Sequence, residues 1–178
     1  MKKAGLGKTA SDQNLSSLLN TALEMGALEA KVIDAKSVVV SYWVRLKCQY
    51  GCGAYGKTLT CPPYSPTPAQ MRQTLAGYTT AILIHVPDES AATQNMVANL
   101  ERTAFLQGHY RAFGVALGPC ERCEKCNLQH CTHPRQARPS MEACGIDVYA
   151  TVRKNGYRID VRKTQEEKPT YYSLLLVE

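Results

Sequence analysis

Four closely spaced cysteines are the clearest chemical signal in this sequence. Cys120, Cys123 and Cys126 are each separated by two residues, and Cys131 follows after four more. Thiolates spaced this tightly converge on one ion or cluster without distorting the backbone, so they suit a metal centre better than disulfides. The first three cysteines match the bacterial ferredoxin pattern, whereas the fourth cysteine and the late Pro134 depart from it. Cys131 can therefore serve this centre or a second one.

A second set of cysteines lies upstream. Cys48, Cys52 and Cys61 lie among glycines, which let the backbone close around a centre and donate amides to its sulfurs. Cys144 is the remaining cysteine and the best candidate for a fourth ligand. Eight cysteines are the number that two four-cysteine centres need, so the sequence predicts two 4Fe-4S centres. The expected metal ligands are Cys48, Cys52, Cys61, Cys120, Cys123, Cys126, Cys131 and Cys144.

Zinc is the chief alternative metal, because four cysteines also form structural zinc sites. Zinc ribbons usually separate two cysteine pairs by a longer arm, so the spacing favours an iron-sulfur cluster. His130 and His133 flank Cys131 and are alternative ligands. For the upstream set, the competing interpretation is buried structural cysteine. A disulfide framework is disfavoured, because we expect a reducing compartment.

A phosphate-binding loop is suggested by the segment from Gly51 to Thr58, which has the required glycine and lysine spacing. That loop also needs a helix that begins at Lys57. Pro62 and Pro63 would stop such a helix within a turn, so we reject this interpretation. Neither a Ser-His-Asp order nor a carboxylate pair stands out, and catalytic residues stay unknown.

Composition indicates one globular domain. The chain has 178 residues, 44% of them hydrophobic and 20% charged, which are ordinary values for a protein with a core. It lacks the apolar stretch of a signal peptide and the roughly 20 apolar residues of a membrane span, so we expect a cytoplasmic protein. The formal charge of +6 would fall to about +2 with two bound clusters. Because the basic residues are also dispersed, we expect no nucleic-acid partner.

The elements that must position the cysteines can be read from periodicity. A dozen N-terminal residues, 1–12, form an expected flexible tail, and the single domain spans 13–178. Leu15 to Leu23 has the apolar stripe of a helix that closes near Gly26. The β-branched and aromatic residues from Val38 to Leu46 predict a strand that leads directly to Cys48.

The middle of the chain reads as strand, helix, strand. After a short helix that Thr67 and Pro68 cap, we expect a strand over 80–86, a helix over 92–108 and a strand over 111–117. This order predicts a right-handed unit with parallel strands, and places Cys120 at the carboxyl edge of the sheet.

The last segments complete the expected fold. A short helix should begin at Ser140 and break at Gly145, and strands over 157–163 and 171–177 should close the sheet. The predicted fold class is α/β, with a mixed, largely parallel sheet flanked by helices and cysteine-rich metal-binding loops at the strand ends.

Several of these segments together resemble a family of prokaryotic predicted metal-binding proteins, rich in cysteine, with a domain of unknown function. The resemblance runs from about Val38 to the C-terminus and implies that both cysteine sets and Cys144 belong to one recurring design. It implies no particular reaction. The segments that carry it are Lys47–Cys52, Tyr55–Lys57, Cys61–Tyr64, Gly118–Cys120 and Arg138–Val148.

Three functions compete on this basis. The first is an iron-sulfur protein of electron transfer, or a redox accessory protein, with a redox partner protein. The second is a cluster-dependent enzyme that acts on a small-molecule substrate through an iron with an open position. The third is a zinc-stabilised binding module without chemistry.

Overall fold

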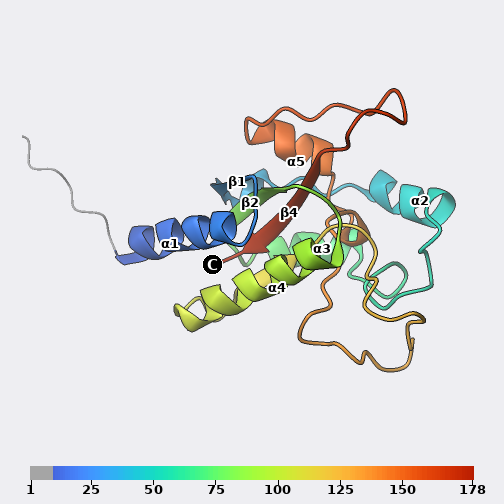
Figure 1. The fold of residues 1–178 in the computed structure, drawn as a ribbon, viewed down its shortest axis with the longest axis horizontal. Helices are drawn as coiled ribbons and strands as arrows, with labels where there is room; N and C mark the ends of the chain where they lie inside the picture. The colour runs from blue at the N-terminus through green and yellow to red at the C-terminus, as the bar shows by residue number, and fades with distance from the viewer. Residues whose placement is uncertain (1–9) are drawn as a thin grey trace, which may run out of the picture.

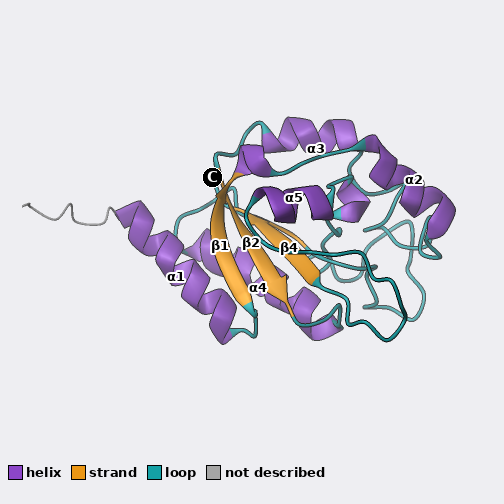
Figure 2. Ribbon diagram, turned by 90° about the horizontal axis from the view of Figure 1, so that it is seen from above, coloured by secondary structure: helices purple, strands orange, loops and turns teal. Residues whose placement is uncertain are grey.

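Three layers make up the fold in the computed structural model, which describes residues 10–178 (Figure 1). Helices α1 and α4 cover one face of a four-stranded sheet, and α3 and α5 cover the other (Figure 2). The elements are α1 (Ala10–Glu24), β1 (Glu29–Asp34), the 3-10 turn η1 (Ala35–Ser37), α2 (Tyr42–Gly51), α3 (Pro68–Leu75), β2 (Thr80–Val86), α4 (Ala91–Leu106), β3 (Phe113–Val115), the 3-10 turn η2 (Glu142–Cys144), α5 (Val148–Lys154) and β4 (Tyr171–Leu176).

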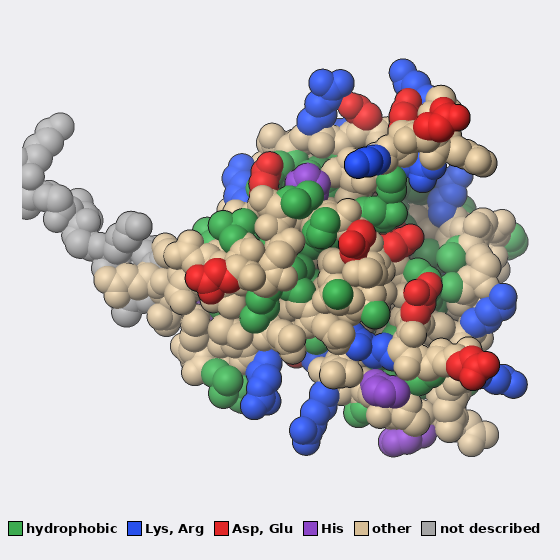
Figure 3. Space-filling model, in the orientation of Figure 1, with side chains coloured by type: hydrophobic (Ala, Val, Ile, Leu, Met, Phe, Trp, Pro, Cys, Tyr) green, Lys and Arg blue, Asp and Glu red, His purple; other side chains and the backbone are tan. Residues whose placement is uncertain are grey.

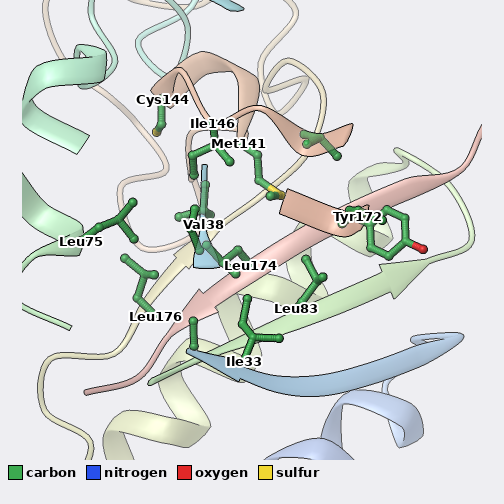
Figure 4. Close-up of a cluster of buried hydrophobic side chains, with 14 of the residues drawn as sticks. Ile33, Val38, Leu75, Leu83, Met141, Cys144, Ile146, Tyr172, Leu174 and Leu176 are labelled. Atoms are coloured by element: carbon green, nitrogen blue, oxygen red, sulfur yellow. The ribbon is translucent and has the colours of Figure 1, made fainter. Parts of the chain in front are cut away.

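The central strands are apolar on both faces because helices cover both faces of the sheet. In β2, Ile82 and Ile84 face α1 and α4, whereas Leu83 faces α3 and α5. In β4, Leu175 faces α1 and α4, and Leu174 faces the other side. All five side chains are fully buried. Figure 4 shows part of the buried cluster on the α3 and α5 face, which includes Leu83 of β2 and Leu174 of β4.

The sheet is antiparallel, so the prediction of a largely parallel sheet is wrong. Its strand order is β1-β2-β4-β3, and each neighbouring pair is antiparallel. Strands β2 and β3 do run in the same direction, as the helix between them requires, but β4 lies between them. The C-terminal strand takes this central place because its apolar side chains need cover on both faces. The carboxyl ends of β2 and β3 therefore still share one edge of the sheet.

The segment that leads to Cys48 is a helix, so the prediction of a strand there is wrong. Helix α2 buries Val44 alone, and its aromatic residues Tyr42 and Trp43 are exposed. The β-branched residues just before it do stay extended, since Val40 forms a bridge with Ile146. The edge strand β1 comes earlier than expected. This strand was not predicted because its sequence is polar, and the sequence is polar because an edge strand presents side chains to solvent.

Most other predicted elements are confirmed. Helix α1 ends shortly before Gly26, and Thr67 caps α3 in a capping box that includes Gln70. The short helix near Ser140 is the 3-10 turn η2, which ends at Gly145 with a φ of +78°. The prediction of a strand over 157–163 is wrong, because this segment has no regular secondary structure. The expected tail, 1–12, lies largely outside the described residues, since α1 begins at Ala10.

The cysteine-bearing segments gather at one end of the molecule. In Figure 1, α2 and the loops after it and after β3 lie at the end opposite to α1. This is the edge where β2 and β3 end and β4 begins. On the face in Figure 3, basic and acidic side chains are interspersed. Among the described residues, no helix is long and apolar enough to cross a membrane.

Candidate metal centre

Three segments bring the upstream cysteines near one another. Cys48 lies in the last turn of α2 and Cys52 caps that helix, so the two are four residues apart on one side of it. Cys61 follows in the next loop, and Cys144 ends η2. Cys48 lies within electrostatic range of each of the other three thiols. We call Cys48, Cys52, Cys61 and Cys144 the first cysteine group.

Tight turns shape the loop between Cys52 and Ser65. Cys61 lies in consecutive turns, in which it donates to the Thr58 carbonyl and accepts from the amide of Ser65. The amide of Gly56, whose φ is +71°, donates to the carbonyl of Pro62 over 2.7 Å and closes the loop. Turns follow Lys57 where a phosphate loop would need a helix, in agreement with the sequence prediction.

Arg45 ties together the three segments that carry the first cysteine group. From α2, its Nη1 donates to the carbonyl of Ala143 over 2.6 Å and to Ser65 Oγ over 3.0 Å. Ser65 Oγ in turn donates to the same Ala143 carbonyl over 2.6 Å. Ala143 directly precedes Cys144, and Ser65 lies four residues after Cys61. The guanidinium therefore fixes the relative position of the cysteines and brings a positive charge close to them.

Burial makes two thiols of the first group harder to ionise. It raises the pKa of Cys48 to about 11, helped by the neighbouring Cys52 thiol and opposed by the charge of Arg45. Burial also raises the pKa of Cys144 to about 12, again against Arg45. A metal that binds these sulfurs must displace their protons.

The members of the first group differ in what they face. Cys48, Cys52 and Cys61 line a cavity of about 360 Å³, together with Glu142. Cys144 has a side chain only 1% exposed, and it packs in the core with apolar neighbours such as Met141 and Ile146 (Figure 4). Three of the four thiols therefore reach an open space, and Cys144 lies behind them.

The downstream cysteines surround a space of their own. Cys120, Cys123, Cys126 and Cys131, which we call the second cysteine group, line one small cavity between the loop after β3 and residues 58–60. Cys131 is within electrostatic range of Cys120. The structure therefore places Cys131 with its own run and not with the upstream set.

Helix α4 and a pair of backbone segments, at Ala116 and at residues 139–141, hold the loop that carries the second cysteine group. We call these two paired segments the stem of the loop. At the stem, the Ala116 amide donates to the Pro139 carbonyl, and the Met141 amide donates to the Ala116 carbonyl. Buried Gln94 of α4 donates to the carbonyls of Leu117 and Pro119, at 3.3 and 2.8 Å. These contacts fix the direction of the backbone just before Cys120.

Arg122 shows that the second group suits an anionic centre. Its Nη1 donates to Asn95 Oδ1 over 2.6 Å, but its Nε and Nη2 atoms are buried without any hydrogen-bond partner. A buried cation with unused donors is unfavourable unless a negative charge lies beside it. A metal centre with four thiolates carries about two negative charges and would supply that partner, whereas four neutral thiols do not.

His133 contacts the second group directly. Its Nδ1 lies 3.4 Å from Cys123 Sγ, and Thr132 Oγ1 lies at the same distance from that sulfur. No corresponding contact of His130 with a thiol is present in the described chain. Within residues 10–178, no three side chains of His, Cys, Asp or Glu are close enough to hold an ion as they stand. Each group is thus a gathering of thiols and not a closed coordination sphere.

One short segment forms part of both sites. Thr58, Leu59 and Thr60 line the space inside the second group, and the next residue, Cys61, lines the cavity of the first. The turn before Cys120 does the same from the other side, since Gly118 and Pro119 line the first cavity. The two cysteine groups are therefore neighbours that share walls.

Sequence reasoning missed the polar residues that position the cysteines. Gln94 had a detectable signal, because it falls on the inner side of α4, one turn before Val97. Arg45, Ser65 and Arg122 had none, since their partners are distant in sequence. Of the tyrosines near the upstream cysteines, Tyr55 lines the cavity, whereas Tyr50 is 80% exposed.

Comparison with known proteins gives one match. The model of a family described as "Predicted metal-binding protein (DUF2284)" matches residues 31–177, which include every cysteine of both groups. No curated protein and no solved structure matches the chain. Because the match covers most of the sequence, the chain belongs to this family of predicted metal-binding proteins of unknown function.

Proposed function

We propose that the protein binds two iron-sulfur centres, each of the 4Fe-4S type, and acts in electron transfer or as a redox accessory protein. The observation that carries this proposal is the division of eight free cysteines into two neighbouring groups of four. Membership of a predicted metal-binding family supports the metal, and the cysteine spacing supports the cluster.

The chain's own residues suit the proposed role. When bound, iron-sulfur clusters accept and donate single electrons. Arg45 and Arg122 offset the negative charge of thiolate-held centres. The shared segment 58–61 keeps the two groups close, and the exposed residues around Leu128 in the second loop offer contact to a redox partner protein. The proposal includes a cytoplasmic location, because free thiols persist in reducing compartments.

A zinc-stabilised module is the second candidate, and two observations favour it. The space inside the second group measures about 20 Å³, which is room for one water-sized particle. His133 Nδ1 also contacts Cys123, as in sites with mixed cysteine and histidine ligands.

Metal analysis tests the proposal. The protein is purified without oxygen, and iron, acid-labile sulfide and zinc are counted per chain. We expect about eight irons and eight sulfides, with an electron paramagnetic resonance signal after reduction. A colourless protein with stoichiometric zinc would overturn the proposal in favour of the second candidate.

Single substitutions then assign the ligands. Cys126→Ser should remove the iron of the second centre, and Cys61→Ser that of the first. His133→Ala is the matched control, because it removes a neighbour of Cys123 without removing a thiol. Loss of metal in His133→Ala would favour zinc.

Cys144 separates the two iron hypotheses. Full retention of both clusters in Cys144→Ser would mean that the first centre has only three thiolates, which favours a cluster-dependent enzyme with a small-molecule substrate. Loss of the first cluster would mean a closed four-thiolate centre, which favours electron transfer. A thermal unfolding curve of the variant separates loss of a ligand from loss of the fold.

A further inference from the structure

The cavity beside the first cysteine group has the size of a small-molecule site. Its volume of about 360 Å³ lies within the roughly 300 to 1,000 Å³ of such sites. One part of its wall carries the thiols of Cys48, Cys52 and Cys61. Another part comes from the start of α5 and the start of β4, through residues 147–149 and 170–172, and holds no cysteine. A centre on the cysteines therefore leaves a wall for a second molecule.

The wall is mostly apolar and rich in aromatic rings. Val44, Leu117 and Ile146 contribute aliphatic surface. Such a wall favours a ligand with an apolar or aromatic body, and ring faces also attract cations. The aromatic residues of the lining are Trp43, Tyr55, Tyr149, Tyr171 and Tyr172.

Two carboxylates give this apolar cavity a negative charge. Glu89 lies against the backbone of Gly118, where a Cβ would stand only 3.1 Å from Glu89 Oε2. Gly118 has a φ of +61°, a backbone conformation that favours glycine. Glu142 also lines the cavity, and both carboxylates are solvent-exposed at its edge.

These two carboxylates lack a basic partner. In the described chain, neither Glu89 nor Glu142 forms an ion pair, and Lys47, the basic residue of the lining, forms none with them. The third acid of the lining, Asp147, is already used, since it caps α5 by accepting from the Ala150 amide over 2.9 Å. A lining with more acidic than basic side chains, next to aromatic rings, favours a positively charged ligand.

We propose that this cavity binds a small organic cation, an amine on an apolar or aromatic body, next to the first cysteine group. The proposal goes beyond metal binding, because it assigns a class of small-molecule ligand to the cavity. It rests on the walls and charges of the cavity, and only the presence of a metal centre beside the ligand rests on the proposed function.

Trp43 provides a direct measurement. It is the single tryptophan of the chain and it lines the cavity, so its fluorescence reports occupation. The as-purified protein is titrated with benzylamine, benzyl alcohol and benzoate, which share a shape and differ in charge, and calorimetry gives each Kd. We expect benzylamine to bind at least about tenfold more tightly than the alcohol, and benzoate to bind least. Equal binding of the three, or no binding at millimolar concentration, would overturn the proposal.

Substitutions locate the charge effect. Glu89→Gln combined with Glu142→Gln should reduce the preference for benzylamine over benzyl alcohol to about one, with alcohol binding retained. Glu24→Gln on α1, at the other end of the molecule, is the matched control and should keep the preference (Figure 1). A preference that survives in the double variant would contradict the assignment. Metal counts on the same samples keep the two proposals apart, because amine binding without iron would refute only the proposed function.

Discussion

Replacing Arg45 tests whether one guanidinium assembles the first cysteine group. Arg45→Met keeps the apolar stem of the side chain and removes the donors to Ala143, Ser65 and Pro66. Of its three part-buried bonds, the two shorter ones, to the Ala143 carbonyl and to Ser65 Oγ, account for most of the expected loss. Hydrogen bonds with a charged partner contribute about 1.5 to 3 kcal/mol each.

The structure also limits that loss. Ser65 Oγ still donates to the Ala143 carbonyl in the variant, so this carbonyl keeps a partner. The bond to the Pro66 carbonyl is exposed, and water replaces it. We therefore expect the free energy of unfolding of the metal-free chain to fall by about 2 to 3 kcal/mol, below the full value of two charged bonds. In the as-purified protein, the first centre should lose metal while the second keeps it.

Urea unfolding followed by circular dichroism measures the stability, and iron counts measure the loading. Arg72→Met is the matched control, because Arg72 also donates to a backbone carbonyl, that of Val40, but at an exposed position, where its guanidinium lies over the ring of Tyr42. The control should lose less than about 1 kcal/mol and no metal. A loss in Arg45→Met no larger than in Arg72→Met, or equal loss of metal from both centres, would refute the assigned role.

Three further predictions concern charge. Arg122→Met should lower the reduction potential of the second centre by on the order of 100 mV in a redox titration, because it removes a positive charge that already acts on Cys120, yet it should not destabilise the metal-free chain; an unchanged potential with a destabilised chain would show that the arginine is structural. The metal-free chain should lose stability as pH rises from 9 towards about 12, because the unfolded chain releases its thiol protons at lower pH than buried Cys48 and Cys144 do; serine at both positions should reduce that slope in urea titrations and leave the part that comes from Tyr172, whose pKa burial also raises to about 12. Glu101→Gln should cost about 3 kcal/mol in thermal or urea unfolding, because it leaves the partly buried guanidinium of Arg138 without its carboxylate; a loss under about 1 kcal/mol would contradict this.

Local signals in the sequence predicted the elements that depend on neighbours in the chain. The capping box at Thr67 and the apolar periodicity of α4 are readable because each works within about four residues. The sheet order was not readable. β4 pairs with β2 across about 95 residues of sequence, since Ala81 lies opposite Leu176. The residue pattern of a strand does not indicate which other strand it will pair with.

The wrong strand before Cys48 has a different cause. β-Branched residues favour strands only where a neighbouring strand accepts them, and Val40 finds just one bridge, to Ile146. From Tyr42 the chain gains more by forming a helix, which brings Cys48 and Cys52 onto one side and points Arg45 at the turn before Cys144. The segment over 157–163 also lacks a partner strand. Of its alternating aliphatic residues, Ile159 is buried and Val161 is exposed.

The candidate site was predictable as a list of cysteines and not as a geometry. Spacing predicted that Cys120, Cys123 and Cys126 lie together, because short intervals constrain the chain by themselves, and the three do line one cavity. It could not say which set Cys131 joins, since that depends on how residues 127–138 fold back. Asn127 decides this locally, by accepting from the amides of Gln129 and His130 and turning the chain before Cys131.

The shared segment 58–61 makes the two cysteine groups parts of one site. Its position is fixed from the first group, by the closure of Gly56 on Pro62 and by the hold of Arg45 on Ser65. Its other side forms the wall against which the second group gathers. A movement of Cys61 therefore shifts the surroundings of Cys120 as well, because three residues of covalent chain connect the two walls. Two independent metal modules would not need this arrangement, whereas centres that exchange electrons benefit from fixed, close positions.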